Sequence, residues 1–187
     1  MDDFAQEFTS WREGCRNTHE VFPPSEDNDS VLSYLGVSKN CPLGYVGFMT
    51  GGIMIQNWIR IYGSGCEKMP RNLKNWNEGK ENRAFYIADD VIGGIFALNG
   101  GFFGENIGDV YYKSPDSLDW ESLDMGYGRF LWWAFNGDVD MFYQDLRWSG
   151  WQEDVKNFPT DHYFFFYPFL WTKEGSVNNR STIKIDY

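Results

Sequence analysis

The stretch "AFYIADDVIGGIFALNGGFFG", residues 84–104, decides the fold. Its apolar segments, 84–88 and 93–99, are rich in β-branched and aromatic residues, which favours strands over helices. Asp89 and Asp90, followed by a glycine pair, indicate a turn between the two segments. Two strands joined by a short turn pair in antiparallel orientation. We therefore expect an antiparallel sheet centred on this stretch.

The flanking sequence extends this sheet in both directions. Asn99-Gly100 is typical of a type I′ hairpin, in which both central residues have positive φ, and "DVYYK" within 108–113 then predicts the returning strand. On the other side, apolar and β-branched residues occupy both faces of an alternating pattern over 53–62, which predicts one central strand.

Helices are predicted on both sides of the strands. Residues 127–136 place apolar side chains on one helical face and meet a stop signal at Asn136-Gly137, and Asp138 is a candidate cap for a helix over 139–146. Capping and stop signals predict further short helices or helix starts at 25–37, 41–52 and 114–123, and apolar patterns predict late strands within 162–171 and 181–187. This order predicts an α+β fold, a mainly antiparallel sheet flanked by helices, in a single domain spanning 1–187.

The composition excludes several classes of protein. Of the 187 residues, 42% are hydrophobic and 19% aromatic, which is too apolar for a disordered chain. Sixteen basic against 27 acidic residues give a net charge of −11, which disfavours nucleic-acid binding and favours either a basic partner or simple solubility. Three widely spaced cysteines without a CxxC motif, and a start without signal-peptide character, favour the cytoplasm.

No motif for catalysis or for a cofactor emerges. The glycine run after Asp90 matches neither a P-loop nor a dinucleotide-binding fingerprint. His19 and His162 have no metal-ligand spacing and no nucleophile motif nearby. The many carboxylates include Asp89 and Asp90, but caps, turns and solvated faces account for most acidic residues in a chain of this charge. We expect a protein that is not an enzyme and holds no metal or cofactor.

The tryptophans offer an alternative function. Five of the nine are candidates to stack on sugar rings: Trp132, Trp133, Trp148, Trp151 and Trp171. Consecutive helical residues such as Trp132 and Trp133 point about 100° apart, so core packing accounts for part of this set. Exposed tryptophans also mark protein interfaces. A carbohydrate-binding module is therefore the alternative to protein binding.

Several segments together resemble the SUKH superfamily. The resemblance rests on "FYIADDVIGGIFALN", "GDVYYKSPDSLDW" and "YGRFLWWAFNGD" and covers about 42–146, with an N-terminal helical segment before it and an aromatic extension, "RWSGW…YPFLW", after it. The segments "GGIMIQNWIRIYGSG", "LNGG", "LRWSGW" and "YPFLW" are also similar to a bacterial family of unknown function. SUKH-like proteins are α+β domains, and many are bacterial immunity proteins that bind and neutralise toxins, often nucleases.

The resemblance and the charge together imply a protein partner, specifically a basic toxin or effector. A nuclease carries basic surface to hold its substrate, and a chain of net charge −11 complements it. We expect an acidic face with aromatic anchors to carry the binding, with these residues as candidates: Asp89, Asp90, Asp116, Asp119, Trp148 and Trp151. No nucleic acid and no membrane is expected as a partner.

Overall fold

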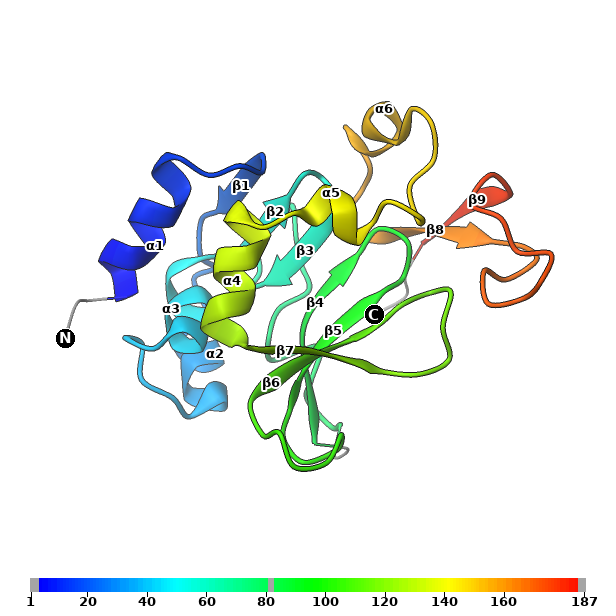
Figure 1. Ribbon diagram of the computed structural model, residues 1–187. Coiled ribbons are helices and arrows are strands. Elements are labelled where there is room, and N and C mark those ends of the chain that lie inside the picture. Colours follow the sequence, from blue (N-terminus) through cyan, green and yellow to red (C-terminus); the bar gives the residue numbers. More distant parts are fainter. Residues whose placement is uncertain (1–3, 81–82, 185–187) are drawn as a thin grey trace.

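The α+β fold predicted from the sequence is confirmed. The computed structural model describes residues 4–80 and 83–184, and within them seven strands form one antiparallel sheet whose spatial order follows the chain, while two further strands form a separate pair (Figure 1). The seven are β1 (His19–Phe22), β2 (Gly52–Ile55), β3 (Ile59–Tyr62), β4 (Ala84–Asp90), β5 (Ile95–Asn99), β6 (Asp109–Lys113) and β7 (Glu121–Gly126). The separate pair is β8 (His162–Phe166) and β9 (Arg180–Lys184).

The helices of the described residues lie before β1, between β1 and β2, and after β7. They are α1 (Phe4–Glu13), α2 (Asn28–Leu35), α3 (Pro42–Met49), α4 (Tyr127–Asn136), α5 (Val139–Phe142) and α6 (Trp151–Val155). The predicted helices at 25–37, 41–52 and 127–136 correspond to α2, α3 and α4. Gly36 ends α2 in the left-handed conformation, with φ of 63°, as the stop signal indicated. Asp138 caps α5 through Met141 N, but this helix ends at Phe142 rather than near 146.

The single strand predicted over 53–62 is a hairpin. Gln56 and Asn57 both have φ of 52°, and the N–H of Trp58 donates to the carbonyl of Ile55 at 2.8 Å, which is the geometry of a type I′ turn. Strands β2 and β3 pair across this turn. The sequence pattern missed it because apolar residues alternate on both sides of the turn without a break.

The predicted turn at Asp89-Asp90 is also displaced. Strand β4 runs through both aspartates to Asp90, and the turn falls at 91–94. Asp89 pairs in register with Ile95 on one side and with Arg60 on the other. Both aspartates can stay in a buried strand because their carboxylates find partners inside the protein.

The connection from β5 to β6 is a longer loop than the predicted type I′ turn. Positive φ occurs at Gly101, 109°, and not at Asn99 or Gly100. The side chain of Asn99 organises the loop: its oxygen accepts from the N–H of Gly101 at 2.8 Å, and its amide nitrogen donates to the carbonyl of Asn106 at 2.8 Å. The asparagine therefore acts through its side chain, as in an Asx turn.

The prediction of a helix start at 114–123 is wrong. Residues 114–119 form a turn, and the chain then enters β7, which pairs with β6 through Tyr112 and Glu121. The serine, proline and acids that resemble a helix start serve the turn instead. Pairing with β6 overrides the local preference, as is common for strand segments.

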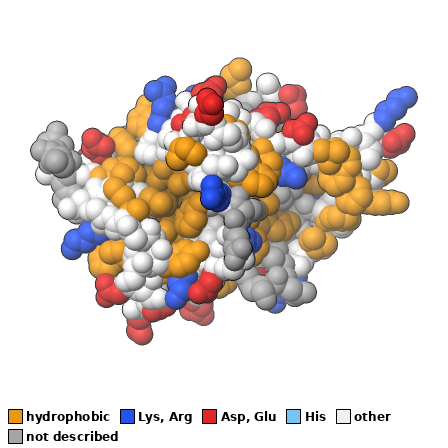
Figure 2. All heavy atoms as spheres, turned by 90° about the horizontal axis from the view of Figure 1, so that it is seen from below, with side chains coloured by type: hydrophobic (Ala, Val, Ile, Leu, Met, Phe, Trp, Pro, Cys, Tyr) orange, Lys and Arg blue, Asp and Glu red, His pale blue; other side chains and the backbone are white. Residues whose placement is uncertain are grey.

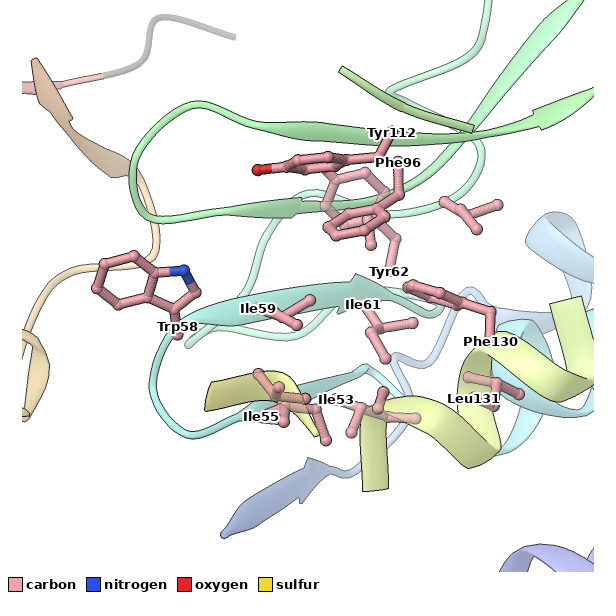
Figure 3. Packing of buried hydrophobic residues seen from close by; sticks show 14 of the residues in the cluster. Ile53, Ile55, Trp58, Ile59, Ile61, Tyr62, Phe96, Tyr112, Phe130 and Leu131 are labelled. Atoms are coloured by element: carbon pink, nitrogen blue, oxygen red, sulfur yellow. The ribbon is translucent and has the colours of Figure 1, made fainter. Parts of the chain in front are cut away.

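The hydrophobic core lies between the main sheet, the helices and β8. Strands β2 and β3 point four isoleucines into it, and α4 covers them with Phe130 and Leu131 (Figure 3). Helices α1, α3 and α4 contact one another on this side. The same cluster of buried residues includes Phe164 and Phe166 of β8, so the C-terminal strand pair is packed onto the sheet.

Candidate functional site

Asp89 lies at the centre of a buried ion cluster. The carboxylate is fully buried, and the guanidinium groups that neutralise it, those of Arg60 and Arg71, are buried as well. Arg60 Nε donates to Asp89 Oδ1 at 2.7 Å, while Arg71 Nη1 and the hydroxyl of Tyr163 donate to Oδ2. The buried ion cluster, defined as these four residues, therefore joins β3, β4, the loop after β3 and β8.

Both arginines also hold the chain that leads into β8. Arg60 Nη1 donates to the carbonyls of Thr160 and His162 at 2.8 Å each, and Arg71 Nη2 donates to the carbonyl of Thr160 at 2.7 Å. The guanidinium of Arg60 lies 4.6 Å from the ring centroid of Tyr163. Charge-assisted bonds of this kind are among the stronger hydrogen bonds in proteins. The cluster thus fastens the C-terminal strand pair to the main sheet.

Asp90 is buried beside this cluster, and its carboxylate forms no ion pair within residues 4–80 and 83–184. Its Oδ1 accepts from the backbone N–H of Gly94 at 2.7 Å, and its Oδ2 accepts from the hydroxyls of Tyr112 at 2.6 Å and Tyr143 at 2.9 Å. Burial raises the pKa of Asp90, and these hydrogen bonds oppose the increase. Gly94 is required here, because a Cβ at this position would lie 2.3 Å from Asp90 Oδ2.

The predicted acidic face is therefore wrong in its main component. Asp89 and Asp90 are interior residues, so they are not available to an external partner. Asp116 and Asp119 are exposed on the loop between β6 and β7. The structure does not bring the four aspartates together on one surface. Two aspartates in a mostly apolar strand are better explained by buried partners, cationic for Asp89 and tyrosine hydroxyls for Asp90. Arg60, in a similarly apolar segment, could have signalled the partner of Asp89.

The two tryptophans predicted as anchors lie mostly inside. Trp148 is 4% exposed and donates from Nε1 to Asp154 at 2.7 Å. Trp151 is half-buried, and the guanidinium of Arg147 lies 3.8 Å from its ring centroid. Trp148 is therefore a core residue, and Trp151 presents only part of its ring to solvent.

An aromatic groove of about 420 Å³ lies where β8 meets the main sheet. It is formed by the turn after β4, the loop between β6 and β7, strand β8 and the segment that follows β8. Its lining residues are Ile92, Gly93, Ile95, Lys113, Ser114, Pro115, Ser117, Leu118, Phe164, Phe165, Phe166, Phe169, Leu170 and Trp171. Leu118 is 67% and Trp171 45% exposed. The rings of Phe169 and Trp171 stack at 4.3 Å. Figure 2 shows hydrophobic side chains gathered at this end of the molecule.

A second hollow lies at the other end, between α1, α4 and the start of α3. We call it the two-tryptophan hollow; it has a volume of about 420 Å³ and is lined by Phe4, Glu7, Trp11, Pro42, Gly128, Arg129 and Trp132. Trp132 is one of the tryptophans singled out in the sequence and is 43% exposed. Trp11 was not predicted, because its segment carries no motif and its neighbour in space is more than a hundred residues away.

The two histidines lie apart from both hollows. His19 Nδ1 is 3.1 Å from Cys15 Sγ, and His162 Nδ1 is 2.7 Å from the carboxylate of Asp161. Burial lowers the pKa of His19. Residues 4–80 and 83–184 contain no group of three His, Cys, Asp or Glu side chains placed to hold a metal ion.

Comparison with known proteins places the whole chain in one family. The model of the family described as "Protein of unknown function DUF2625" matches residues 2–187. The chain belongs to this family. It is 42% identical over 181 residues to the putative uncharacterized protein YbfG of Escherichia coli (strain K12), covering 94% of this chain and 84% of the relative. It is also 42% identical over 171 residues to an uncharacterized protein of Haemophilus influenzae (strain ATCC 51907 / DSM 11121 / KW20 / Rd), covering 87% of this chain and 75% of the relative.

The family match agrees with the similarity to a bacterial family of unknown function. The resemblance to the SUKH superfamily is not tested by these comparisons and stays a prediction. No solved structure matches the chain. Among the helices that the structure describes, none is long and apolar enough to span a membrane.

Proposed function

We propose that this DUF2625 protein is a non-catalytic, cytoplasmic partner-binding protein of the immunity type, which neutralises a basic toxin or effector. The aromatic groove is its binding site. An apolar side chain of the partner enters the groove, and basic side chains of the partner meet the acidic loop beside it. The observation that carries the proposal is the exposed apolar lining of the groove, above all Leu118 and Trp171.

The groove has the character of a protein-binding anchor site. Leu118, Phe169 and Trp171 are large apolar side chains, and 67%, 37% and 45% of their respective surfaces stay exposed. Exposed apolar surface of this kind is unfavourable in water unless a partner covers it. Buried aromatic anchors contribute most of the binding energy of many interfaces. Phe169 and Trp171 therefore replace Trp148 as the aromatic component of the proposed binding face, with Leu118 beside them as an aliphatic anchor.

The charge beside the groove favours a basic partner. Asp116 lies between the lining residues Pro115 and Ser117, and Asp119 follows Leu118. Both are exposed, so they retain the role that Asp89 and Asp90 lose. The net charge of −11 adds a long-range attraction to a cationic protein.

The test is a direct binding measurement. Basic proteins encoded beside the gene for this protein are produced as inactive variants and titrated against it by biolayer interferometry. We expect one to bind, and we expect Trp171→Ala and Leu118→Ser each to weaken it about tenfold or more. Tyr34→Ala, on the exposed surface of α2, is the matched control and leaves the affinity unchanged. Absence of any binding partner, or wild-type affinity in both groove variants, contradicts the proposal.

A further inference from the structure

The two-tryptophan hollow combines two indole rings with two charged side chains. Trp11 and Glu7 come from α1, one helical turn apart, while Trp132 and Arg129 come from α4. Phe4 and Pro42 complete the apolar lining. The helix positions explain the arrangement, because residues three or four apart on a helix share one face.

The charged groups of the hollow are free to bind a ligand. Among residues 4–80 and 83–184, neither the Glu7 carboxylate nor the Arg129 guanidinium makes an ion pair or a side-chain hydrogen bond. One group only accepts hydrogen bonds and the other only donates them. An open, mostly apolar hollow with a few polar groups that fix orientation is the usual form of a small-molecule site.

We propose that this hollow binds a carbohydrate, a pyranose of the β-1,4-linked glucose type. In such a ring the hydroxyls are equatorial, so both faces expose C–H groups that pack on indole rings. The hydroxyls at the ring edge both donate and accept, and therefore satisfy Glu7 and Arg129 together. A purely apolar ligand leaves both charges unpaired, which is unfavourable once they are covered.

The proposal is independent of the protein-binding groove. The two sites have no lining residue in common, and they lie at opposite ends of the molecule, at α1 and α4 on one side and at β8 on the other (Figure 1). A failure of one proposal therefore leaves the other standing.

The test uses cellotriose as the probe and the full-length protein. Binding is followed by isothermal titration calorimetry and by tryptophan fluorescence. We expect saturable binding that Trp132→Ala weakens about tenfold, since the loss of one ring contact of about 1.4 kcal/mol has this effect. Glu7→Gln and Arg129→Gln also weaken binding and keep the apolar walls. Trp171→Ala, in the aromatic groove, is the matched control and binds as the wild type does.

Two outcomes overturn the inference. The first is the absence of saturable binding of cellotriose to the folded wild-type protein. The second is an affinity for cellotriose that falls in Trp171→Ala but not in Trp132→Ala, because this result shows that the sugar binds in the aromatic groove instead. A β-1,4-linked galactotriose carries the C4 oxygen axially on each ring, as a hydroxyl at the non-reducing end and as the linkage oxygen elsewhere, and is expected to bind more weakly; equal affinity contradicts the assignment to the glucose type.

Discussion

Asp89 is the side chain on which two buried guanidinium groups depend. Without its charge, Arg60 and Arg71 remain buried and lose their counter-ion, and removing one partner from a buried ion pair costs about 3–5 kcal/mol. We therefore expect Asp89→Asn to lower the free energy of unfolding by about this amount in urea titrations. The control, Asp116→Asn, changes an exposed carboxylate and should stay within about 0.5 kcal/mol of the wild type. Equal stabilities of the two variants contradict this role of Asp89.

Asp90 gives a different prediction, because its carboxylate is buried and pairs with no cationic side chain in the part of the chain that the structure describes. Its pKa is raised above the ordinary 3.8, mainly by burial. The folded protein therefore keeps this proton to higher pH than the unfolded chain does. As the pH rises from near that ordinary value through the raised pKa, ionisation of Asp90 reduces the stability of the wild type.

The side chain at position 90 cannot ionise in the variant Asp90→Asn, so this variant does not lose stability in this way as the pH rises. We expect the stability of the wild type minus that of Asp90→Asn to fall as the pH rises from about 4, and to become constant above the raised pKa. Urea titrations of both proteins between about pH 4 and about pH 8 measure the difference. A difference that is constant with pH, or that grows in favour of the wild type, contradicts the raised pKa.

The sequence showed that Asp89 and Asp90 are special but not why. Aspartate favours turns, and glycines follow, so a turn at these residues was the natural local prediction. The partners that keep both residues in a strand are distant in sequence: Arg60 lies 29 residues before Asp89, and Tyr143 lies 53 residues after Asp90. Such pairings depend on tertiary structure and leave only an indirect trace, a charged residue within an apolar strand.

The β2–β3 hairpin depends on a turn that ordinary side chains adopt with strain. Asn57 has φ of 52°, where asparagine is tolerated and a β-branched residue is not. We expect Asn57→Val to lower the free energy of unfolding by about 1–2 kcal/mol, and Asn57→Gly to match or exceed the wild type. Thermal unfolding of the three proteins gives the comparison. If valine is tolerated as well as glycine, the hairpin turn is not under this constraint.

The β8–β9 pair depends on the buried ion cluster for its attachment. Arg71→Met removes the bonds to Asp89, Tyr163 and the carbonyl of Thr160, but leaves the hydrogen bonds within the main sheet unchanged. We expect the amides of β8 to exchange hydrogen about tenfold faster in this variant, with a smaller change in β5 and β6. Hydrogen-exchange mass spectrometry measures both regions in one sample. A uniform increase in the exchange rate over the chain shows instead that β8 unfolds only with the whole domain.

Elements with a clear apolar pattern of their own, such as α4 and β4 to β6, were predictable, and strands that lack such a pattern were not. Helix α4 has an apolar face and a stop signal within its own sequence, so 127–136 was predicted correctly. Strand β7 has neither, and half of its residues resemble a helix start; its conformation is set by β6 beside it. Strand β1 was missed for the same reason, since it is fixed by its register with β2.

At the scale of the whole molecule, the excess of acidic residues produces an electrostatic field in the surrounding solvent. The 27 acidic and 16 basic side chains create a negative field, while the buried ion cluster is shielded from salt by the protein around it. The predicted attraction to a basic partner is therefore a property of exposed residues alone. Asp116 and Asp119, beside the aromatic groove, are the exposed acids placed to guide such a partner to its site.

Guidance by local charge and guidance by net charge have different consequences. Glu26→Gln with Asp27→Asn removes the same charge as Asp116→Asn with Asp119→Asn, but on exposed positions next to α2, which lies away from β8 (Figure 1). The screening length is about 10 Å at 0.1 M salt, so only charges near the groove act strongly on an approaching partner. We expect the pair beside the groove to slow association severalfold, the distant pair to have little effect, and dissociation to change little in either.

This comparison is made by stopped-flow or interferometry with the partner that the binding screen identifies. Raising the salt to about 1 M, where the screening length falls to about 3 Å, should bring the association rates of all three proteins together. Equal slowing by both double variants at low salt assigns the effect to net charge and removes Asp116 and Asp119 from the binding site. Slowing that persists at high salt assigns them a direct contact, because only groups in contact with the partner escape screening.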